Sequence, residues 1–260
     1  MTNDFAQAAA LVKLANAKGL TLAVGQQMRY RRHYRAVRRF IAAGKLGSVE
    51  MINLLNTKPR HAALNLAGMD QPALYEMACH HFDALMALLP GRAPETIICD
   101  GFQPSWSVYG GPCMVNALIR FSGGPHVLYQ GGFSSQADNY ELRLEGSRGA
   151  LRCRGIHMSN DTMANEFAER GHSFAAADID RDVPAADPWA MYFDIWRRYL
   201  GGGAEPPFSG RNNLQIMALL SAGIESVETA QPLPVAVAGN PRYAAAFSST
   251  VLGSPSIAGS

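Results

Sequence analysis

Hydrophobic positions recur at two different spacings along this chain of 260 residues. Helical spacing of three and four governs much of the first part of the chain and residues 188–229, whereas alternation with a period of two governs residues 96–154. We therefore expect an α+β fold in which a large, open and mainly antiparallel sheet is flanked by helices.

The first residues predict one helix and one short strand. Residues 4–18 place apolar side chains at helical spacing, with Asn3 or Asp4 as the N-cap. The segment Leu20–Val24 is fully apolar, which is typical of a strand inside a parallel sheet. A helix and a buried strand form the second half of a βαβ unit, and no glycine-rich turn of a first half precedes them.

An arginine-rich helix follows, with Tyr34, Val37 and Ile41 in its apolar stripe and Gly44 at its end. Its other positions carry arginine at 29, 31, 32, 35, 38 and 39. Such a run indicates either a nucleic-acid or anionic-membrane patch or a solvated helix face. We favour the solvated face, because no aromatic platform or second basic element accompanies it. We expect no nucleic-acid or membrane partner.

The chain is organised around Ala73–Pro90, which the pattern predicts to be a buried helix. Glu76 and His80 lie four residues apart, so an α-helix would present both side chains on one face. A carboxylate and an imidazole on one face could act on the same small molecule. His81 would point about 100° away from His80, and we expect it to support packing.

The remaining elements follow from alternation, turns and caps. Helices are expected at 188–200 and 212–229, with Asp187 and Ser209 as caps. Residues 156–183 are expected to be an irregular excursion, and residues 232–237 a last strand or extended segment. The predicted strands are Ser48–Thr57, Thr96–Cys99, Met114–Phe121, Val127–Phe133, Glu141–Glu145 and Ala150–Arg154.

Composition narrows the class of protein. Hydrophobic residues make up 48% of the chain and the formal net charge is +2, which gives no global attraction to nucleic acid or to an anionic membrane. The four cysteines are widely spaced, which favours reduced thiols over a disulfide framework. No apolar run reaches the ~20 residues that span a bilayer, and the polar N-terminus is unlike a secretory signal. We therefore expect a cytoplasmic protein.

Four segments form an ordered series through most of the chain. They are AAALVKLANAKGLTLAVGQQMRYRRHYRAVRRFIAAGKLGSV, EMACHHFD, YELRLEGSRGALRC and SGRNNLQIMALLSAGIESVETAQPLPV. Together they resemble the Gfo/Idh/MocA family of nicotinamide-dependent sugar and cyclitol oxidoreductases. The second segment resembles that family's D-x-G-x-H-x-x-D motif, with His80 and Asp83 matching, but Glu76 replaces the aspartate and Ala78 the glycine.

The resemblance also implies a domain organisation. Members of the family begin with a glycine-rich dinucleotide-binding domain of on the order of 100 residues, which ends in a Glu-Lys-Pro motif whose lysine helps catalysis. We therefore expect an N-terminally truncated form, with residues 1–28 as the remnant of a Rossmann domain. Residues 29–238 would form the substrate and oligomerisation domain, and residues 239–260 a loosely ordered tail. The Lys58-Pro59 pair falls too late in the chain to replace the catalytic lysine.

The candidate chemistry centres on His80. Oxidising a secondary alcohol needs a base for the hydroxyl proton and an acceptor for the hydride, and an imidazole with an ordinary pKa near 6.5 suits the first role. Glu76 could orient the imidazole or bind a substrate hydroxyl. The alternative for His80 is a hydrogen-bonded core histidine. A metal site at Cys79-His80-His81 is not expected, because adjacent helical side chains diverge.

Four further residues lie near this chemistry by resemblance. Gln26, Gln27 and Arg29 follow the short apolar strand, at the edge where open α/β sheets bind ligands, although they could equally form a polar loop. Asp83 could support His80 or could be a buried, hydrogen-bonded acid. Both alternatives stay open on the sequence alone.

Two functions are consistent with these features. The first is an oxidoreductase of sugar-like alcohols that uses NAD or NADP. The second is a non-catalytic binding or oligomerisation module, because a chain without a phosphate cradle and a catalytic lysine should bind nicotinamide cofactors very weakly. By resemblance we expect a homo-oligomer formed through the face of the sheet, and we expect the isolated chain to be inactive.

Overall fold

The computed structural model describes residues 1–260 except 63, 67, 157–162 and 236–260. Its centre is one sheet with the strand order β8-β7-β6-β5-β1-β4-β3-β2-β9. All neighbouring strands run antiparallel except β1 and β4, which are parallel. The strands are β1 (Val49–Pro59), β2 (Pro94–Phe102), β3 (Met114–Phe121), β4 (His126–Gly132), β5 (Ser134–Gly146), β6 (Gly149–Gly155), β7 (Ala164–Glu169), β8 (Ala175–Ala176) and β9 (Leu233–Pro234).

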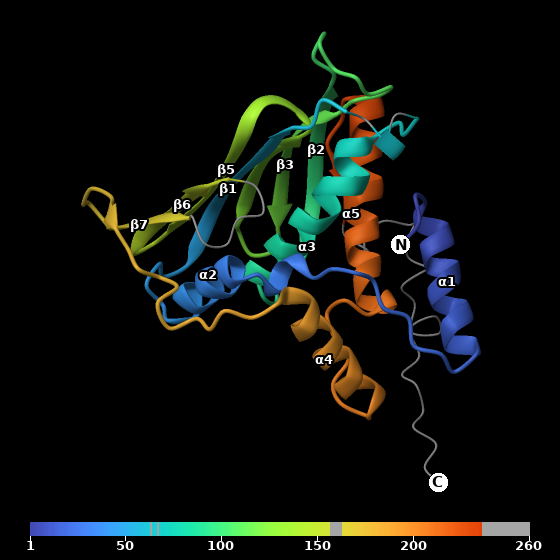
Figure 1. The fold of residues 1–260 in the computed structure, drawn as a ribbon, viewed down its shortest axis with the longest axis horizontal. Helices are drawn as coiled ribbons and strands as arrows, with labels where there is room; N and C mark the ends of the chain where they lie inside the picture. The colour runs from blue at the N-terminus through green and yellow to red at the C-terminus, as the bar shows by residue number, and fades with distance from the viewer. Residues whose placement is uncertain (63, 67, 157–162, 236–260) are drawn as a thin grey trace.

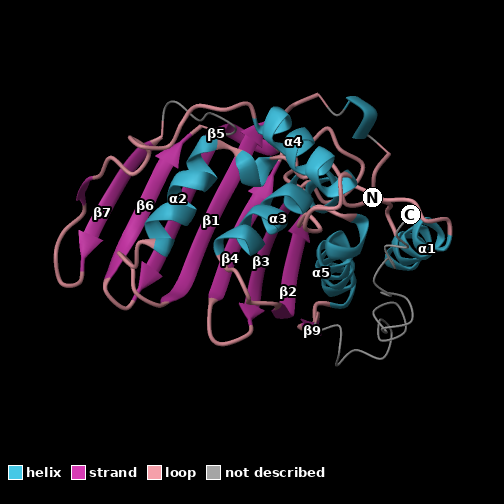
Figure 2. Cartoon of the chain, turned by 90° about the horizontal axis from the view of Figure 1, so that it is seen from below, coloured by secondary structure: helices cyan, strands magenta, loops and turns pink. Residues whose placement is uncertain are grey.

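Helices cover one face of this sheet and one of its edges. Figure 2 shows α2 and α3 lying across the same face, with α5 beside β2 and α1 outside α5. This arrangement confirms the predicted fold class. No helix among the described residues is both long and apolar enough to cross a bilayer. The helices are α1 (Phe5–Ala17), η1 (Met28–Tyr30), α2 (Arg32–Ala42), η2 (Leu64–Leu66), η3 (Ala73–Ala78), α3 (Cys79–Leu88), α4 (Pro188–Leu200) and α5 (Gly210–Thr229).

The main core lies between the sheet and α3 and α5. Alternate positions of β1, including Ile52 and Leu54, are buried against the helices, whereas Met51 on the other face is 48% exposed. Phe82 and Leu85 of α3 meet this inner face and are fully buried. Because burying a large apolar side chain contributes about 1.5–3 kcal/mol, the period-two pattern of the strands fixes which face the helices cover.

Short polar side chains cap α1, α4 and α5, as expected. Asp4 caps α1 by accepting a hydrogen bond from the backbone N–H of Gln7 (2.8 Å). Asp187 and Ser209 cap α4 and α5 in the same way. Each cap satisfies backbone donors that a helix leaves unpaired at its start. The predicted start of α4 is confirmed to the residue.

Two sequence-based expectations differ from the structure. Leu20–Val24 is not a strand of the sheet: it makes one isolated bridge, from Ala23 to Ser209, because the described residues offer it no neighbouring parallel strands. The excursion predicted at 156–183 contains β7 and the short β8, which continue the sheet at its edge. A strand at a sheet edge pairs on one side only, so β8 can carry a weak pattern. The predicted tail, 239–260, lies outside the described residues.

The central helix begins differently from its prediction. Residues Ala73–Ala78 form a π-helix, η3, which continues into the α-helix α3 at Cys79. A π-helix has wider turns than an α-helix and is frequent at functional sites. The regular i, i+4 geometry predicted for Glu76 and His80 therefore does not hold over the whole segment.

A buried polar network joins α2 to β5. His33 is 4% exposed, and its Nε2 lies 2.8 Å from the hydroxyl of Tyr140, which donates to the hydroxyl of Tyr34 at 3.3 Å. Burial lowers the pKa of His33 to about 4. The folded protein therefore keeps this imidazole neutral where the unfolded chain, with a pKa of 6.5, takes up a proton.

This network predicts a specific loss of stability in acid. Between pH 6.5 and about 4 the unfolded state binds a proton that the folded state does not, so stability falls as the pH falls. We expect the wild type to lose about 2 kcal/mol more than His33→Gln between pH 7 and pH 5, because glutamine can hydrogen-bond Tyr140 without titrating. Urea denaturation at both pH values measures this difference. Equal losses in the two proteins would contradict the assignment.

Candidate active site

His80 stands in the first turn of α3 and its side chain is partly buried. Its Nδ1 lies 3.0 Å from Oε1 of Gln26, which is 3% exposed. An amide oxygen only accepts hydrogen bonds, so this contact places the proton of the neutral imidazole on Nδ1. Among the described residues Nε2 has no hydrogen-bond partner. Nε2 is thus an available proton acceptor.

Charge and burial together set the protonation of His80. Burial is the largest influence and lowers the pKa of His80 below 6.5. The carboxylate of Glu76 opposes this shift, and the positive charges of Lys58 and Arg31 add to it. The imidazole is therefore neutral at neutral pH, which is the state that a general base requires.

Glu76 lies in η3 and takes a different partner from the one expected. Its Oε1 accepts a hydrogen bond from Nη1 of Arg60 at 2.8 Å, and its side chain is 37% exposed. Glu76 therefore acts on His80 through its charge, while its direct contact holds Arg60.

Lys58 also belongs to this group of charges, although the sequence-based candidate site did not include it. It continues the inward-facing series of β1, after Ile52, Leu54 and Asn56, because β1 extends two residues beyond its predicted end. Burial lowers the pKa of Lys58, and Glu76 opposes that shift. Among the described residues no carboxylate lies within 4 Å of it. The alternation of β1, followed two residues further, would have found Lys58.

His80 borders a cavity of about 300 Å³ between residues 24–26 and α5. Asn213 of α5 is 1% exposed and lines this cavity, and its side-chain nitrogen is buried with no hydrogen-bond partner among the described residues. An unsatisfied buried donor costs about 1–3 kcal/mol, so this amide is suited to an acceptor on a bound molecule. Burial raises the pKa of Cys79, which also lines the cavity, to about 12, so its sulfur is a thiol and not a nucleophilic thiolate.

Arg29 and Asp83 form a buried ion pair with each other. Arg29 donates from Nε to Oδ2 of Asp83 at 2.7 Å, and from Nη2 to the Asp83 carbonyl at 3.1 Å. Burial raises the pKa of Asp83, which is fully buried, and Arg29 opposes that shift. The pair ties η1 to α3 one turn beyond His80.

Gln27 is absent from the cavity lining, and its buried carboxamide oxygen has no partner within the described part of the chain.

The described residues do not fit a complete dinucleotide. A pyrophosphate is usually held by free backbone N–H groups at a helix N-terminus after a glycine-rich turn. The N-terminus of α1 is capped instead by the carboxylate of Asp4, which would repel a phosphate. In the same part of the chain no group of three or more His, Cys, Asp or Glu residues is arranged to hold a metal ion.

Comparisons with known proteins agree with this architecture. The model of an oxidoreductase family, C-terminal alpha/beta domain (Gfo/Idh/MocA), matches residues 38–237. An uncharacterised protein, y4oX, from Sinorhizobium fredii is 30% identical over 178 residues, which is 64% of this chain and 48% of that protein. The chain thus spans about half the length of that relative. Inositol 2-dehydrogenase from Rhizobium meliloti is 23% identical over 242 residues, covering 90% of this chain and 71% of that enzyme.

Solved structures share the fold at low identity. An aldose-aldose oxidoreductase from Caulobacter crescentus, complexed with glycerol, has a TM-score of 0.75 at 18% identity and covers 90% of this chain and 70% of its own. An inositol dehydrogenase homolog from Azotobacter vinelandii, complexed with NADH and myo-inositol, has a TM-score of 0.65 at 17% identity, with 89% and 69% covered. At these identities the likeness establishes the fold.

The buried ion pair makes a testable prediction. Asp83→Ala leaves the Arg29 guanidinium buried without its partner, so the free energy of unfolding should fall by about 3–5 kcal/mol. Urea denaturation followed by tryptophan fluorescence measures the loss. The control is Asp194→Asn on α4, whose ion pairs with Arg197 and Arg198 are exposed and should contribute little to the free energy of unfolding. Similar losses in the two variants would show that the buried pair is not needed for stability.

Proposed function

The chain belongs to the Gfo/Idh/MocA family of oxidoreductases, and on that premise we propose that it acts on a secondary alcohol of a sugar or cyclitol. The observation that carries this proposal is the state of His80. Gln26 holds Nδ1 and leaves Nε2 as a neutral acceptor beside a cavity. A base fixed in one tautomer at a cavity wall suits the removal of a hydroxyl proton.

The proton step uses groups of this chain alone. The substrate O–H donates its proton to Nε2 of His80, and the lowered pKa of His80 keeps that nitrogen free above acidic pH. As the imidazole becomes positive, the carboxylate of Glu76 stabilises it. Lys58, whose charge is felt at His80, would stabilise negative charge that develops on the substrate oxygen.

A polyhydroxy substrate suits the lining of the cavity. The side chains of Gln26, Tyr75 and Asn213 present neutral hydrogen-bonding groups there, and neutral donors and acceptors match hydroxyl groups better than carboxylates or phosphates. The related proteins support the same class, since one is an inositol 2-dehydrogenase and another was crystallised with myo-inositol.

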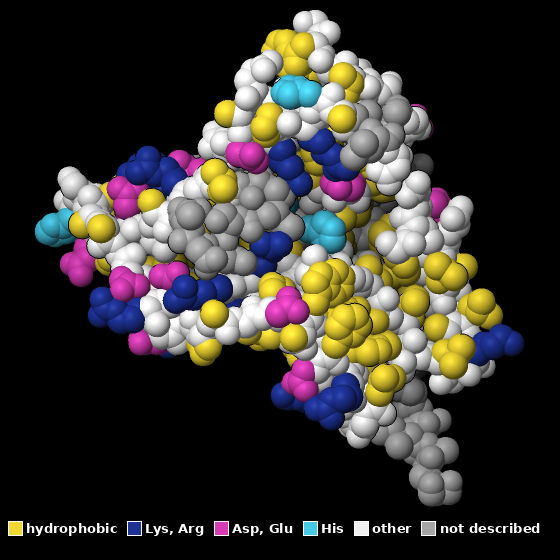
Figure 3. All heavy atoms as spheres, viewed as in Figure 1, with side chains coloured by type: hydrophobic (Ala, Val, Ile, Leu, Met, Phe, Trp, Pro, Cys, Tyr) yellow, Lys and Arg dark blue, Asp and Glu magenta, His cyan; other side chains and the backbone are white. Residues whose placement is uncertain are grey.

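NAD or NADP is the hydride acceptor that family membership supports, and one structural neighbour holds NADH. Because the described residues do not fit its pyrophosphate, we propose that a dinucleotide-binding part covers α1 and α4. Both helices expose large apolar side chains, including Leu14 at 54% and Phe193 at 58%. Figure 3 shows hydrophobic side chains gathered over these two helices. Exposed apolar surface of this kind is typical of a contact with another folded part.

The second candidate is a binding or oligomerisation module without catalysis. It is favoured by one observation, the occupied helix N-terminus at Asp4 where a phosphate would need free N–H groups. The two candidates differ in whether His80 engages a polyol.

We expect this chain to bind myo-inositol through neutral His80. Binding should shift the NMR signals of the His80 imidazole, and affinity should fall as the pH drops through the lowered pKa of His80, because protonated Nε2 no longer accepts a hydrogen bond. His80→Asn should weaken binding on the order of tenfold. His126→Asn, at an exposed position of β4, is the matched control and should bind as the wild type does.

A dinucleotide titration completes this test. NADH or NADPH at millimolar levels should neither quench tryptophan fluorescence nor raise the melting temperature of this chain. Saturable NADH binding by this chain would contradict the proposal that the dinucleotide is held by a part outside the described residues. The non-catalytic module would be favoured if the chain shows no detectable affinity for myo-inositol, glycerol or aldoses, or if His80→Asn leaves that affinity unchanged.

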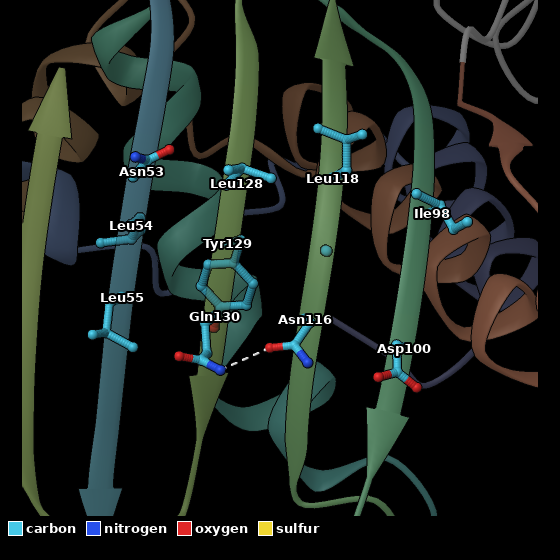
Figure 4. A pocket seen from close by; sticks show the side chains of 11 residues that line it. Asn53, Leu54, Leu55, Ile98, Asp100, Asn116, Leu118, Leu128, Tyr129 and Gln130 are labelled. Carbon is cyan, nitrogen blue, oxygen red and sulfur yellow. Dashed lines mark hydrogen bonds between the residues drawn. The ribbon is translucent and has the colours of Figure 1, made fainter. Parts of the chain in front are cut away.

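The outer face of the sheet supports a homo-oligomer. No helix of the described chain covers it, and Met51, Ile98 and Leu128 are 48%, 37% and 52% exposed there. Figure 4 shows these strands with polar side chains between the apolar ones, including a hydrogen bond from Gln130 to Asn116 of 2.9 Å. A flat surface with mixed apolar and amide groups can pair with a second copy of itself.

Oligomerisation through this face can be tested by one charge. Leu128→Glu should convert the assembly to monomers in size-exclusion chromatography with light scattering, because the same charge enters a two-fold interface twice. Leu200→Glu on α4 is the control, since Leu200 is 58% exposed and lies on another surface. A wild-type monomer at micromolar concentration, or an oligomer that Leu128→Glu leaves intact, would contradict the proposal.

A further inference from the structure

A second recess lies away from His80, at the C-terminal ends of α2 and α3. It has a volume of about 640 Å³ and includes Arg35, Arg38 and Arg39 in its lining. Leu88, another lining residue, is eight residues beyond His80, which is about 12 Å along a helix. The recess shares no lining residue with the cavity beside His80, and Arg29 also lines the recess. Figure 2 shows α2 and α3 lying beside each other on the sheet.

The three arginines lie on one side of α2, because positions 35, 38 and 39 are separated by three and four residues. Arg35 donates from Nη2 to the carbonyl of Pro184, and Arg39 donates from Nη1 to the carbonyl of Asp182. These contacts orient both guanidinium groups. A backbone carbonyl is neutral, so the contacts hold the guanidinium groups in place without cancelling their charge.

The recess keeps uncompensated positive charge. Arg29 and Arg32 are neutralised by Asp83 and Asp180, whereas none of the three arginines forms an ion pair within the described part of the chain. Arg39 contacts only the backbone carbonyl of Asp182, and the Asp182 carboxylate forms no ion pair with any of the three within the described residues.

Individual donors in the recess also lack partners. The Nε of Arg35 is buried and has no acceptor among the described residues, and Arg38 makes no hydrogen bond there. The positive charges of Arg32 and Arg38 add to burial in lowering the pKa of Arg35. Like charges that crowd in this way favour the binding of an anion.

The walls of the recess are apolar. They include Ile41, Leu88, Pro90, Val183, Pro184 and Pro207. A volume of this size with apolar walls and a few oriented polar groups is typical of a small-molecule site. Guanidinium groups match the oxygens of a phosphoryl group in charge and in geometry.

We propose that this recess binds a small organic molecule that carries a phosphoryl group, with Arg35, Arg38 and Arg39 on the phosphoryl oxygens and the apolar walls on its carbon body. The alternative is that these arginines only complement the negative end of α2 and remain solvated. That alternative predicts no saturable binding.

Phenyl phosphate is the probe, because it joins a phosphoryl dianion to an apolar ring. Isothermal titration in 0.15 M salt should give a Kd of about 1 mM or lower, and inorganic phosphate should bind at least about fivefold more weakly, because it lacks the apolar ring. Arg38→Gln should weaken phenyl phosphate binding about tenfold with an unchanged melting temperature, because Arg38 holds no other group. Arg197→Gln, the same charge loss on α4, should leave the affinity unchanged.

Each other outcome overturns the proposal. Undetectable binding of phenyl phosphate at about 10 mM, or an equal loss in Arg38→Gln and Arg197→Gln, would leave only a solvated basic face. Benzoate that binds as tightly as phenyl phosphate would assign the site to carboxylates. Binding of duplex DNA at 0.15 M salt that depends on Arg38, without binding of phenyl phosphate, would assign the surface to nucleic acid.

Discussion

The attachment of α3 to the sheet is the constraint on which the candidate site depends. His81 is 1% exposed, and its Nε2 and Nδ1 each lie 2.8 Å from a sheet residue, Asn56 of β1 and the hydroxyl of Tyr129 on β4. These strands are the parallel pair at the middle of the sheet. With His81 held against them, helical geometry turns His80 about 100° away, toward Gln26 and the cavity. The buried network thus fixes the rotation of α3, and with it the direction of the base.

Desolvation is the common cause of the electrostatics around this helix. It lowers the pKa of His33, Lys58 and His80, raises that of Asp83, and is the largest influence in every case. The structure compensates for this desolvation in two ways. Asp83 receives a full counter-charge from Arg29, whereas His80 receives a neutral amide. A fully paired acid stabilises the fold, and a neutral base with a free nitrogen stays available for chemistry.

The sequence pattern predicted the regular elements well where the local signal was strong. Strand β3 and helix α4 begin and end where alternation and the Asp187 cap placed them. The pattern failed where structure depends on neighbours. The apolar segment Leu20–Val24 reads as a strand but pairs through one bridge only, and β7 pairs with β6 despite a weak signal of its own. Pairing supplies backbone partners that no local pattern encodes.

The sequence by itself determined the fold class, because it follows from periodicity, and its resemblance to a family motif made His80 the candidate base. Only the tertiary structure decided what His80 touches. Gln26 is 54 residues away in the chain, and Asn213 approaches the same cavity from α5. The same holds for the pairing of Glu76 with Arg60. Contacts of this kind depend on how helices and strands pack, and packing is a property of the whole folded chain.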